Sequence, residues 1–387
     1  MDMKQSKCAQ AVTPSLTRKL FNMAQEIGDD VINLTLGDPD LLPPEEIRKA
    51  ACEAIMAGRT RYSANAGLPM LREAFASFFG KEHGISVEPD KNVIATVGGM
   101  EALFLSISAL VDVEDEVIIL EPYYVNYHQM LNMCGGVAVP VNRYGKSDDE
   151  VIELISDAIT TRTVGIVLNS PCNPTGDILS GKVLDEVAKL ACANDLFIIS
   201  DEVYSSLVYD GKKCESIYTR PGMRERTIVI DSCSKRFAMT GWRIGFAVGP
   251  EDVIDNMTKM QENVVACAPL PAQYAAIKAY KEDFDYSYIQ KEYQKRKDLL
   301  VAALKDMPKI HFQEPKATFY CFVNVSETGL DAEQFAYQLL EKQHVAVVPG
   351  VAYGEHYSSY VRIAFTLDQK KLAEAMRRMK AFCEGLK

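Results

Sequence analysis

The sequence has no apolar run long enough to cross a bilayer. Runs such as 117–120 are far shorter than the roughly 20 residues that a spanning helix needs. Residues 1–10, MDMKQSKCAQ, contain no apolar core of a secretory leader. None of the ten cysteines forms a C-x-x-C pair, so we expect no metal site. Scattered cysteines without an export signal favour reduced thiols and a cytoplasmic protein.

Cations are also in deficit. Lys and Arg number 42 against 53 Asp and Glu, a net charge of -11, which argues against nucleic acid as a partner because its phosphates demand a basic face. Neither a membrane partner nor internal repeats are indicated. Hydrophobic residues at 48% and charged residues at 25% are ordinary for a soluble globular protein. A chain of 387 residues fits one large domain and one smaller domain.

The most informative stretch is 232–245, SCSKRFAMTGWRIG, which follows a strand-like run at 227–230. Its lysine, Lys235, stands near Arg236 and Arg243, and protonation beside like charges is disfavoured, so its pKa should be depressed. Such a lysine is a nucleophile for carbonyls and forms a Schiff base. The serine hydroxyls and an arginine suit a phosphate. A nucleophilic lysine beside a set of phosphate-binding side chains is the combination that pyridoxal phosphate requires. The alternative is an ordinary solvated lysine.

The pattern S-x-S-K-x-x-x-x-x-G-x-R-x-G resembles the lysine motif of the class I/II pyridoxal-phosphate-dependent aminotransferases of fold type I, in the aspartate/aromatic branch. The resemblance covers essentially the whole chain. It implies an α/β fold with a large domain, built on a mostly parallel seven-stranded sheet, and a smaller α/β domain. The division expected is 1–45 for the N-terminal arm and part of the small domain, 46–284 for the large cofactor-binding domain and 285–387 for the small C-terminal domain.

The apolar runs support that fold. They carry few polar interruptions, which is typical of parallel strands covered on both faces, and ligands bind at the carboxyl ends of such strands. The strands expected in the large domain are 92–97, 117–120, 137–141, 164–168, 197–200, 227–230 and 244–248. In the C-terminal part we expect strands at 317–322, 345–348 and 360–365, and in the large domain a helix at 69–79.

Several motifs directly follow these strands. Gly98 and Gly99 open a helix after the first strand, an arrangement that binds anions through free N–H groups. The resemblance assigns the cofactor phosphate to this loop, including Met100. It implies that Tyr124 stacks on the cofactor ring. The alternative is that Tyr124 is a tyrosine of the hydrophobic core without a role in binding. By the same resemblance Ser232 and Arg243 hold the phosphate, and Lys235 forms the Schiff base.

Two further strand ends carry polar motifs. The loop N-x-P-x-N-P-T-G at 169–176 is specific to the family, which implies that Asn173 contacts both the cofactor's phenolic oxygen and the substrate carboxylate. We predict a cis bond between Asn173 and Pro174. After 197–200 comes D-E-x-Y. A carboxylate must keep the ring nitrogen protonated, and Asp201 fits that role, while Tyr204 would bond the phenolic oxygen.

The remaining site residues come from outside this sheet. Gly37, in a G-x-P-D turn, would lie against the substrate carboxylate, and Arg362 would grip that carboxylate with a bidentate fork. A structural ion pair is the alternative for Arg362. Tyr62 would cross an interface to the neighbouring subunit's phosphate, which implies a homodimer. Many aspartate-using members carry a lysine at the position of Met100, so its absence weakens an aspartate assignment.

The function implied is transfer of an amino group from an L-amino acid to a 2-oxo acid by a ping-pong mechanism, with Lys235 moving the proton. Two alternatives stay open. A C–S β-lyase on the same scaffold would need the same lysine. A non-catalytic cofactor-binding regulator is disfavoured by the lack of a basic DNA-binding appendage.

Overall fold

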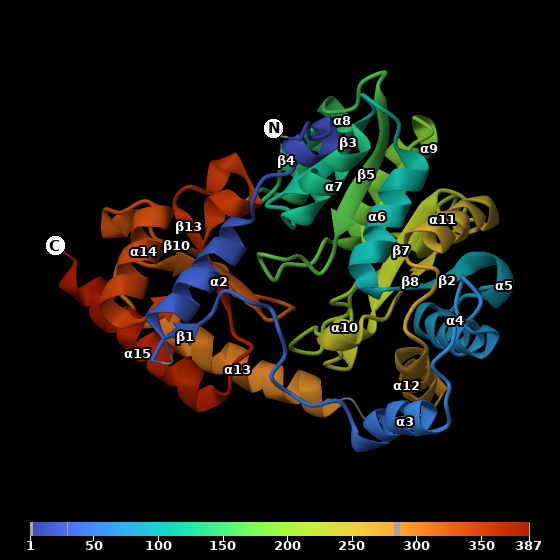
Figure 1. The fold of residues 1–387 in the computed structure, drawn as a ribbon. Coiled ribbons are helices and arrows are strands. Elements are labelled where there is room, and N and C mark those ends of the chain that lie inside the picture. Colours follow the sequence, from blue (N-terminus) through green and yellow to red (C-terminus); the bar gives the residue numbers. More distant parts are fainter. Residues whose placement is uncertain (1–2, 29, 282–286, 387) are drawn as a thin grey trace.

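The computed structural model describes residues 3–28, 30–281 and 287–386. Its centre is a seven-stranded sheet in the order β2-β8-β7-β6-β5-β3-β4 (Figure 1). Only β8 runs antiparallel to its neighbours β2 and β7. The expected mostly parallel sheet is therefore confirmed, and the predicted strands match it to within two residues at each end. The strands are β2 (Val93–Thr96), β3 (Glu116–Glu121), β4 (Val137–Asn142), β5 (Thr163–Asn169), β6 (Phe197–Asp201), β7 (Thr227–Ser232) and β8 (Gly245–Val248).

Helices cover both faces of this sheet because successive side chains of a strand point to opposite sides. Along β3, Val117 and Ile119 pack under one set of helices, whereas Ile118 and Leu120 pack under the other. The first set is α6 (Gly98–Leu110), α7 (Asn126–Cys134) and α11 (Glu251–Val264), and the second is α8 (Asp148–Asp157) and α9 (Gly181–Ala193).

At the β2–β8 end of the sheet a third apolar cluster joins three helices: α3 (Glu45–Met56), α4 (Pro69–His83) and α12 (Leu270–Lys281). Helix α4 continues four residues beyond its predicted end at Phe79 and stops at Gly84, a left-handed glycine cap. The structure also contains two short helices, α1 (Lys7–Ala11) and α5 (Pro89–Asn92).

The C-terminal part contains a four-stranded antiparallel sheet in the order β12-β13-β10-β9. The N-terminal residues pack with this C-terminal part. Strand β1 (Ile32–Asn33) pairs in parallel with β11 (Val345–Ala346) in a separate two-stranded sheet. We keep the three-part division of the chain as a proposal; its boundary at 284 and 285 lies outside the described residues. The elements are α2 (Leu16–Ile27), α13 (Ser287–Lys305), β9 (His311–Phe312), β10 (Tyr320–Asn324), α14 (Ala332–Gln343), β12 (Val348–Pro349), β13 (Tyr360–Ala364) and α15 (Gln369–Gly385).

Two strand predictions in this part were wrong in detail. The run expected as one strand at 345–348 divides after Ala346, and its halves pair in different sheets. The strand expected from Ala317 begins only at Tyr320, because Thr318 has a positive φ of 64°, which no extended strand accommodates. Both errors concern local pairing, which an apolar pattern does not specify.

The ring of Phe246 offers a direct test of this packing. It is fully buried on β8 and stacks on Phe75 of α4 with centroids 3.9 Å apart. We expect Phe246→Ala to lower the free energy of unfolding by about 3–5 kcal/mol, because a large cavity would open between sheet and helix. Val113→Ala, at a side chain 75% exposed, serves as the control and should change it by less than about 0.5 kcal/mol. Urea denaturation measures both, and equal effects would contradict this packing.

Candidate active site

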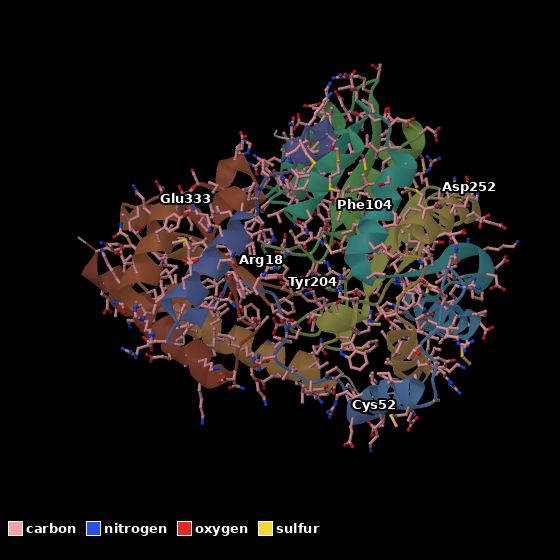
Figure 2. The ribbon with its side chains drawn as sticks, viewed as in Figure 1. Arg18, Cys52, Phe104, Tyr204, Asp252 and Glu333 are labelled. Carbon is pink, nitrogen blue, oxygen red and sulfur yellow. The ribbon has the colours of Figure 1, made fainter. Side chains whose placement is uncertain are left out.

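A cavity of about 430 Å³ lies where the carboxyl ends of β5, β6 and β7 meet the C-terminal part. Tyr204 from the segment after β6 and Arg18 from α2 both line it (Figure 2). The structure brings eleven of the twelve predicted site residues to its wall: Gly37, Gly99, Met100, Tyr124, Asn173, Asp201, Tyr204, Ser232, Lys235, Arg243 and Arg362. Tyr62 is not among them; its side chain is 87% exposed on the surface.

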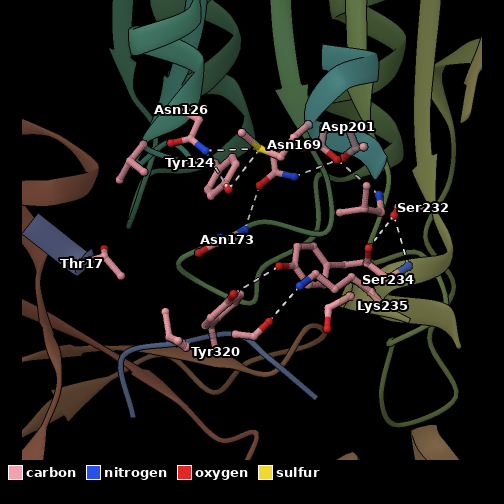
Figure 3. A pocket seen from close by; sticks show the side chains of 18 of the residues that line it. Thr17, Tyr124, Asn126, Asn169, Asn173, Asp201, Ser232, Ser234, Lys235 and Tyr320 are labelled. Carbon is pink, nitrogen blue, oxygen red and sulfur yellow. Dashed lines mark hydrogen bonds between the residues drawn. The ribbon is translucent and has the colours of Figure 1, made fainter. Parts of the chain in front are cut away.

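Lys235 projects from the short helix α10 (Cys233–Arg236), which begins where β7 ends. The Ser232 hydroxyl caps this turn by accepting the Ser234 N–H at 3.1 Å. The Lys235 Nζ donates to the Gly37 carbonyl at 2.8 Å (Figure 3). The lysine is thereby held between the large sheet and the N-terminal segment.

The pKa of Lys235 is lowered to about 8. The direction agrees with the sequence prediction, but the main cause is burial, which penalises the charged amine. Asp38 opposes the shift, and the cations Arg362 and Arg243 add to it. Arg236, which the sequence analysis had counted among the cations acting on this lysine, instead bonds to Glu82. An amine with this pKa exists in both protonation states near neutral pH.

Asp201 ends β6 and is 4% exposed. Its carboxylate accepts hydrogen bonds from the Tyr127 hydroxyl and from the Val203 N–H. Burial nevertheless raises its pKa to about 6, because these donors only partly offset the lost hydration. A cation placed against this carboxyl group would restore its charge.

Gly98 opens α6, and Gly99 and Met100 in its first turn line the same cavity wall as Ser232, Ser234 and Arg243. The free N–H groups of such a first turn are donors for an anion. Glycine is needed here: Gly98 has a φ of +75°, and a Cβ on it would lie 2.5 Å from Arg243 Nη2. This set of hydroxyl, guanidinium and backbone donors fits a phosphate. With Tyr124 as an aromatic wall and Asp201 as a buried acid, the residues fit the pyridoxal phosphate that the resemblance implies.

Arg362 is a buried cation on β13, 4% exposed. Its Nη1 donates to Asn173 Oδ1 at 3.0 Å and its Nη2 to the Thr35 carbonyl, while Nε has no hydrogen-bond partner among the residues that the structure describes. The guanidinium lies between the rings of Tyr320 and Tyr353, 4.3 and 5.1 Å from their centroids. No carboxylate in the described part of the chain lies within 4.0 Å of it, which removes the alternative of a structural ion pair. The arrangement suits an anionic ligand.

The loop that carries Asn173 has the predicted cis bond between Asn173 and Pro174. The bonds Glu121–Pro122 and Ser170–Pro171 are also cis, which was not anticipated. The Asn173 N–H donates to Asn169 Oδ1 at 2.8 Å, so the side chain of the first asparagine of the motif supports the backbone of the second.

Several cavity residues were missed by sequence reasoning. Ser234 stood in the motif but was not assigned a role. Tyr127, Tyr320 and Tyr353 had no motif to mark them, and only the fold places them near the cavity. Asn126 donates to the Met100 sulfur at 3.3 Å, and the Tyr124 hydroxyl donates to it at 3.4 Å. Met100 thus gives this wall a neutral thioether.

Residues 3–28, 30–281 and 287–386 contain neither a membrane-spanning helix nor a candidate metal site. No helix there is long and apolar enough to span a bilayer. No group of three or more His, Cys, Asp or Glu side chains in those ranges is arranged to hold a metal ion.

The family model for aminotransferase class I and II matches residues 29–379. An aspartate aminotransferase of Pyrococcus abyssi is 39% identical over 95% of each chain, and aromatic-amino-acid aminotransferase 2 of Thermococcus litoralis is 38% identical over 95% of each chain. The structure of aspartate aminotransferase from Thermus thermophilus with maleate aligns with a TM-score of 0.91 at 36% identity, covering 98% of this chain and 100% of that one.

The phosphate cradle makes a testable prediction. We expect Gly98→Ala to weaken binding of pyridoxal phosphate by about tenfold or more, because the new Cβ displaces Arg243 and strains the backbone. Gly211→Ala is a matched control: its φ of +68° is equally unfavourable, but no atom lies within 4 Å of the new Cβ. Equilibrium dialysis measures both affinities, and similar losses in the two variants would contradict the cradle.

Proposed function

The chain belongs to the family of class I and II aminotransferases, pyridoxal-phosphate-dependent transferases, and on that premise we propose that Lys235 is its cofactor lysine and Arg362 its carboxylate anchor. The observation that carries the proposal is that Lys235 and Arg362 line the same cavity. A lysine with a pKa lowered to about 8 and a buried arginine without an acidic partner line one cavity. This pair suits a substrate that has both an amine and a carboxylate.

The cofactor, when bound, supplies a carbonyl group for amines and a conjugated ring that accepts the electron pair released at the substrate α-carbon. Ser232, Ser234, Arg243 and the N–H groups that open α6 would hold its phosphate. Asp201 would stabilise a proton on the ring nitrogen, and that positive charge in turn would keep Asp201 ionised despite its burial. The Tyr127 hydroxyl orients this carboxylate.

The chain's own part in the chemistry is orientation and proton transfer. Arg362 and Asn173, already bonded to each other, would bind the substrate carboxylate and thereby fix the α-carbon. The Lys235 amine would remove the proton from that α-carbon and deliver a proton to the cofactor carbon that receives the amino group. Its near-neutral pKa permits both transfers. Tyr204 and Tyr320, joined by a hydroxyl contact of 3.3 Å, wall the cavity beside this amine.

Lys235→Ala tests this role. We expect the rate of amino transfer to fall by about 10²–10⁴-fold or more, because the variant loses its general acid and base. The assay supplies one L-amino acid without a 2-oxo acid and follows conversion of the bound cofactor to its amine form. In the parent protein supplied with cystathionine, breakage of the bond between the β-carbon and sulfur, with steady release of a thiol, pyruvate and ammonia, would favour the C–S lyase. A Lys235→Ala variant with undiminished transfer would overturn the assignment.

Met100 leads us to propose a donor with an apolar or aromatic side chain in preference to aspartate. Its neutral sulfur, bonded by Tyr124 and Asn126, offers no positive charge to a second carboxylate at this part of the wall. Met100→Lys should raise kcat/KM for aspartate relative to phenylalanine by about tenfold, the effect of one hydrogen bond between charged groups. Met100→Leu is the neutral control, and an unchanged ratio in Met100→Lys would contradict this specificity.

We also propose a homodimer in which Tyr62 reaches the neighbouring subunit's phosphate. The exposure of Tyr62 and of Met56, each 87%, leaves apolar side chains uncovered in the single chain. Co-expression of Lys235→Ala and Tyr62→Ala chains tests it, because only a mixed dimer contains one site with both residues intact. Activity of the mixture above that of either variant alone is expected; no gain would contradict a shared site.

Finally, a cytoplasmic location is proposed. All ten cysteines are unpaired in the structure, and thiols of this kind persist in a reducing compartment.

A further inference from the structure

A buried polar network lies behind the cavity and does not line it. Arg236, which follows Lys235, is 8% exposed and donates to Glu82 of α4 through both terminal nitrogens, at 3.3 and 3.1 Å. One of these, Nη2, also donates to Ser205 Oγ at 3.0 Å and lies 3.6 Å from Asp231 Oδ2. The guanidinium thus joins three separate segments of the chain.

Three members of this network, Arg236, Asp231 and Ser205, are each next to a residue of the cavity wall. Asp231 precedes Ser232 and accepts its N–H at 2.6 Å, and Ser205 follows Tyr204. A displacement of the network would therefore move the phosphate-binding serine, the lysine and the tyrosine together.

Asp231 also lies behind Asp201 in the sheet. Asp201 on β6 is in register with Ile230 on β7, so the next residue, Asp231, points to the opposite face. It is 5% exposed, and its charge raises the pKa of Asp201. Burial raises the pKa of Asp231 itself to about 6, against the effect of Arg236, so the group is mainly ionised above neutral pH.

The other groups that face Asp231 are Glu82 on α4, Tyr280 on α12, Glu202 after β6 and the neighbouring Cys233. Glu202 differs from Asp231 in its protonation state near neutral pH. Burial raises its pKa to about 8, and its carboxyl group is bonded by the hydroxyls of Ser200 and Ser216. Near pH 7, Glu202 is therefore mainly neutral while Asp231 carries charge.

We propose that Asp231 and Arg236 are a positioning pair for the reaction: Arg236 fixes the lysine-bearing turn against α4, and Asp231 places a second negative charge behind Asp201. The pair acts through its neighbours and touches neither substrate nor cofactor. This inference rests on the function proposed above, because it assumes that the Lys235 nitrogen and Asp201 bind the cofactor.

The two residues carry opposite charges, so their removal should have opposite electrostatic effects. Asp231→Asn keeps the acceptor for the Ser232 N–H but removes a negative charge, which disfavours protons on nearby groups. Arg236→Gln removes a positive charge and leaves Glu82 and Asp231 without their partner, which favours such protons. Arg236→Lys keeps the charge but loses the fork.

The test is a pH titration of the visible absorbance of the cofactor-loaded protein, which reports the proton on the Lys235 nitrogen, together with the dissociation constant of pyridoxal phosphate. We expect the midpoint to fall by about 0.5–1 pH unit in Asp231→Asn and to rise by a similar amount in Arg236→Gln. Arg236→Lys should keep the midpoint and bind the cofactor several-fold more weakly.

Two controls are matched to these variants. Glu202→Gln replaces a buried acid that is already neutral near pH 7, and Arg220→Gln removes an arginine that pairs with Asp185 and Glu215 away from the cavity. Neither should move the midpoint.

Midpoints of Asp231→Asn and Arg236→Gln that move in the same direction, or not at all, would overturn the inference. If Asp231→Asn does not fold, the contrast between Arg236→Gln and Arg236→Lys decides by the same criterion. The absence of any visible band from the parent protein would overturn the role of Lys235 and this inference with it, whereas a normal band with unmoved midpoints would overturn the inference alone.

Discussion

The candidate active site depends on one electrostatic constraint: two cationic side chains, Lys235 and Arg362, line the same cavity. Burial lowers the pKa of the lysine, and the arginine adds to that effect. The arginine is held in place because the Thr35 carbonyl and Asn173 accept its hydrogen bonds and two tyrosine rings flank it. A ligand that offers a carboxylate to one cation and a carbonyl or amine to the other relieves the constraint.

The fold satisfies this constraint by joining chain segments that are distant in sequence. β6 and β7 deliver Asp201 and Ser232 to one edge of the sheet, and β13 delivers Arg362 from the C-terminal part. The hydrogen bond from Lys235 to the Gly37 carbonyl ties the N-terminal segment to the same place. The rigid sheet on one side and the arginine's aromatic clamp on the other fix the distance between the two cations.

The sequence was sufficient for those site residues that occur in contiguous motifs after strands, since spacing within a motif survives folding as local geometry. Lys235, Asp201 and Asn173 were located in this way. Tyr127 was not, because its contact with Asp201 depends on how α7 packs on the sheet. The dominance of burial in the pKa of Lys235 was also beyond reach, since sequence neighbours show charges but not hydration. Likewise an apolar run such as 345–348 does not reveal that its halves pair in different sheets.

The most direct measurement of the central claim is borohydride reduction of the cofactor-loaded protein, followed by peptide mass spectrometry. Reduction converts a carbon–nitrogen double bond between lysine and cofactor into a stable amine, so the modified residue identifies itself. We expect a single pyridoxyl adduct, on Lys235, that disappears when an L-amino acid is added before the reductant. An adduct on another lysine, or none in protein with bound cofactor, would contradict it.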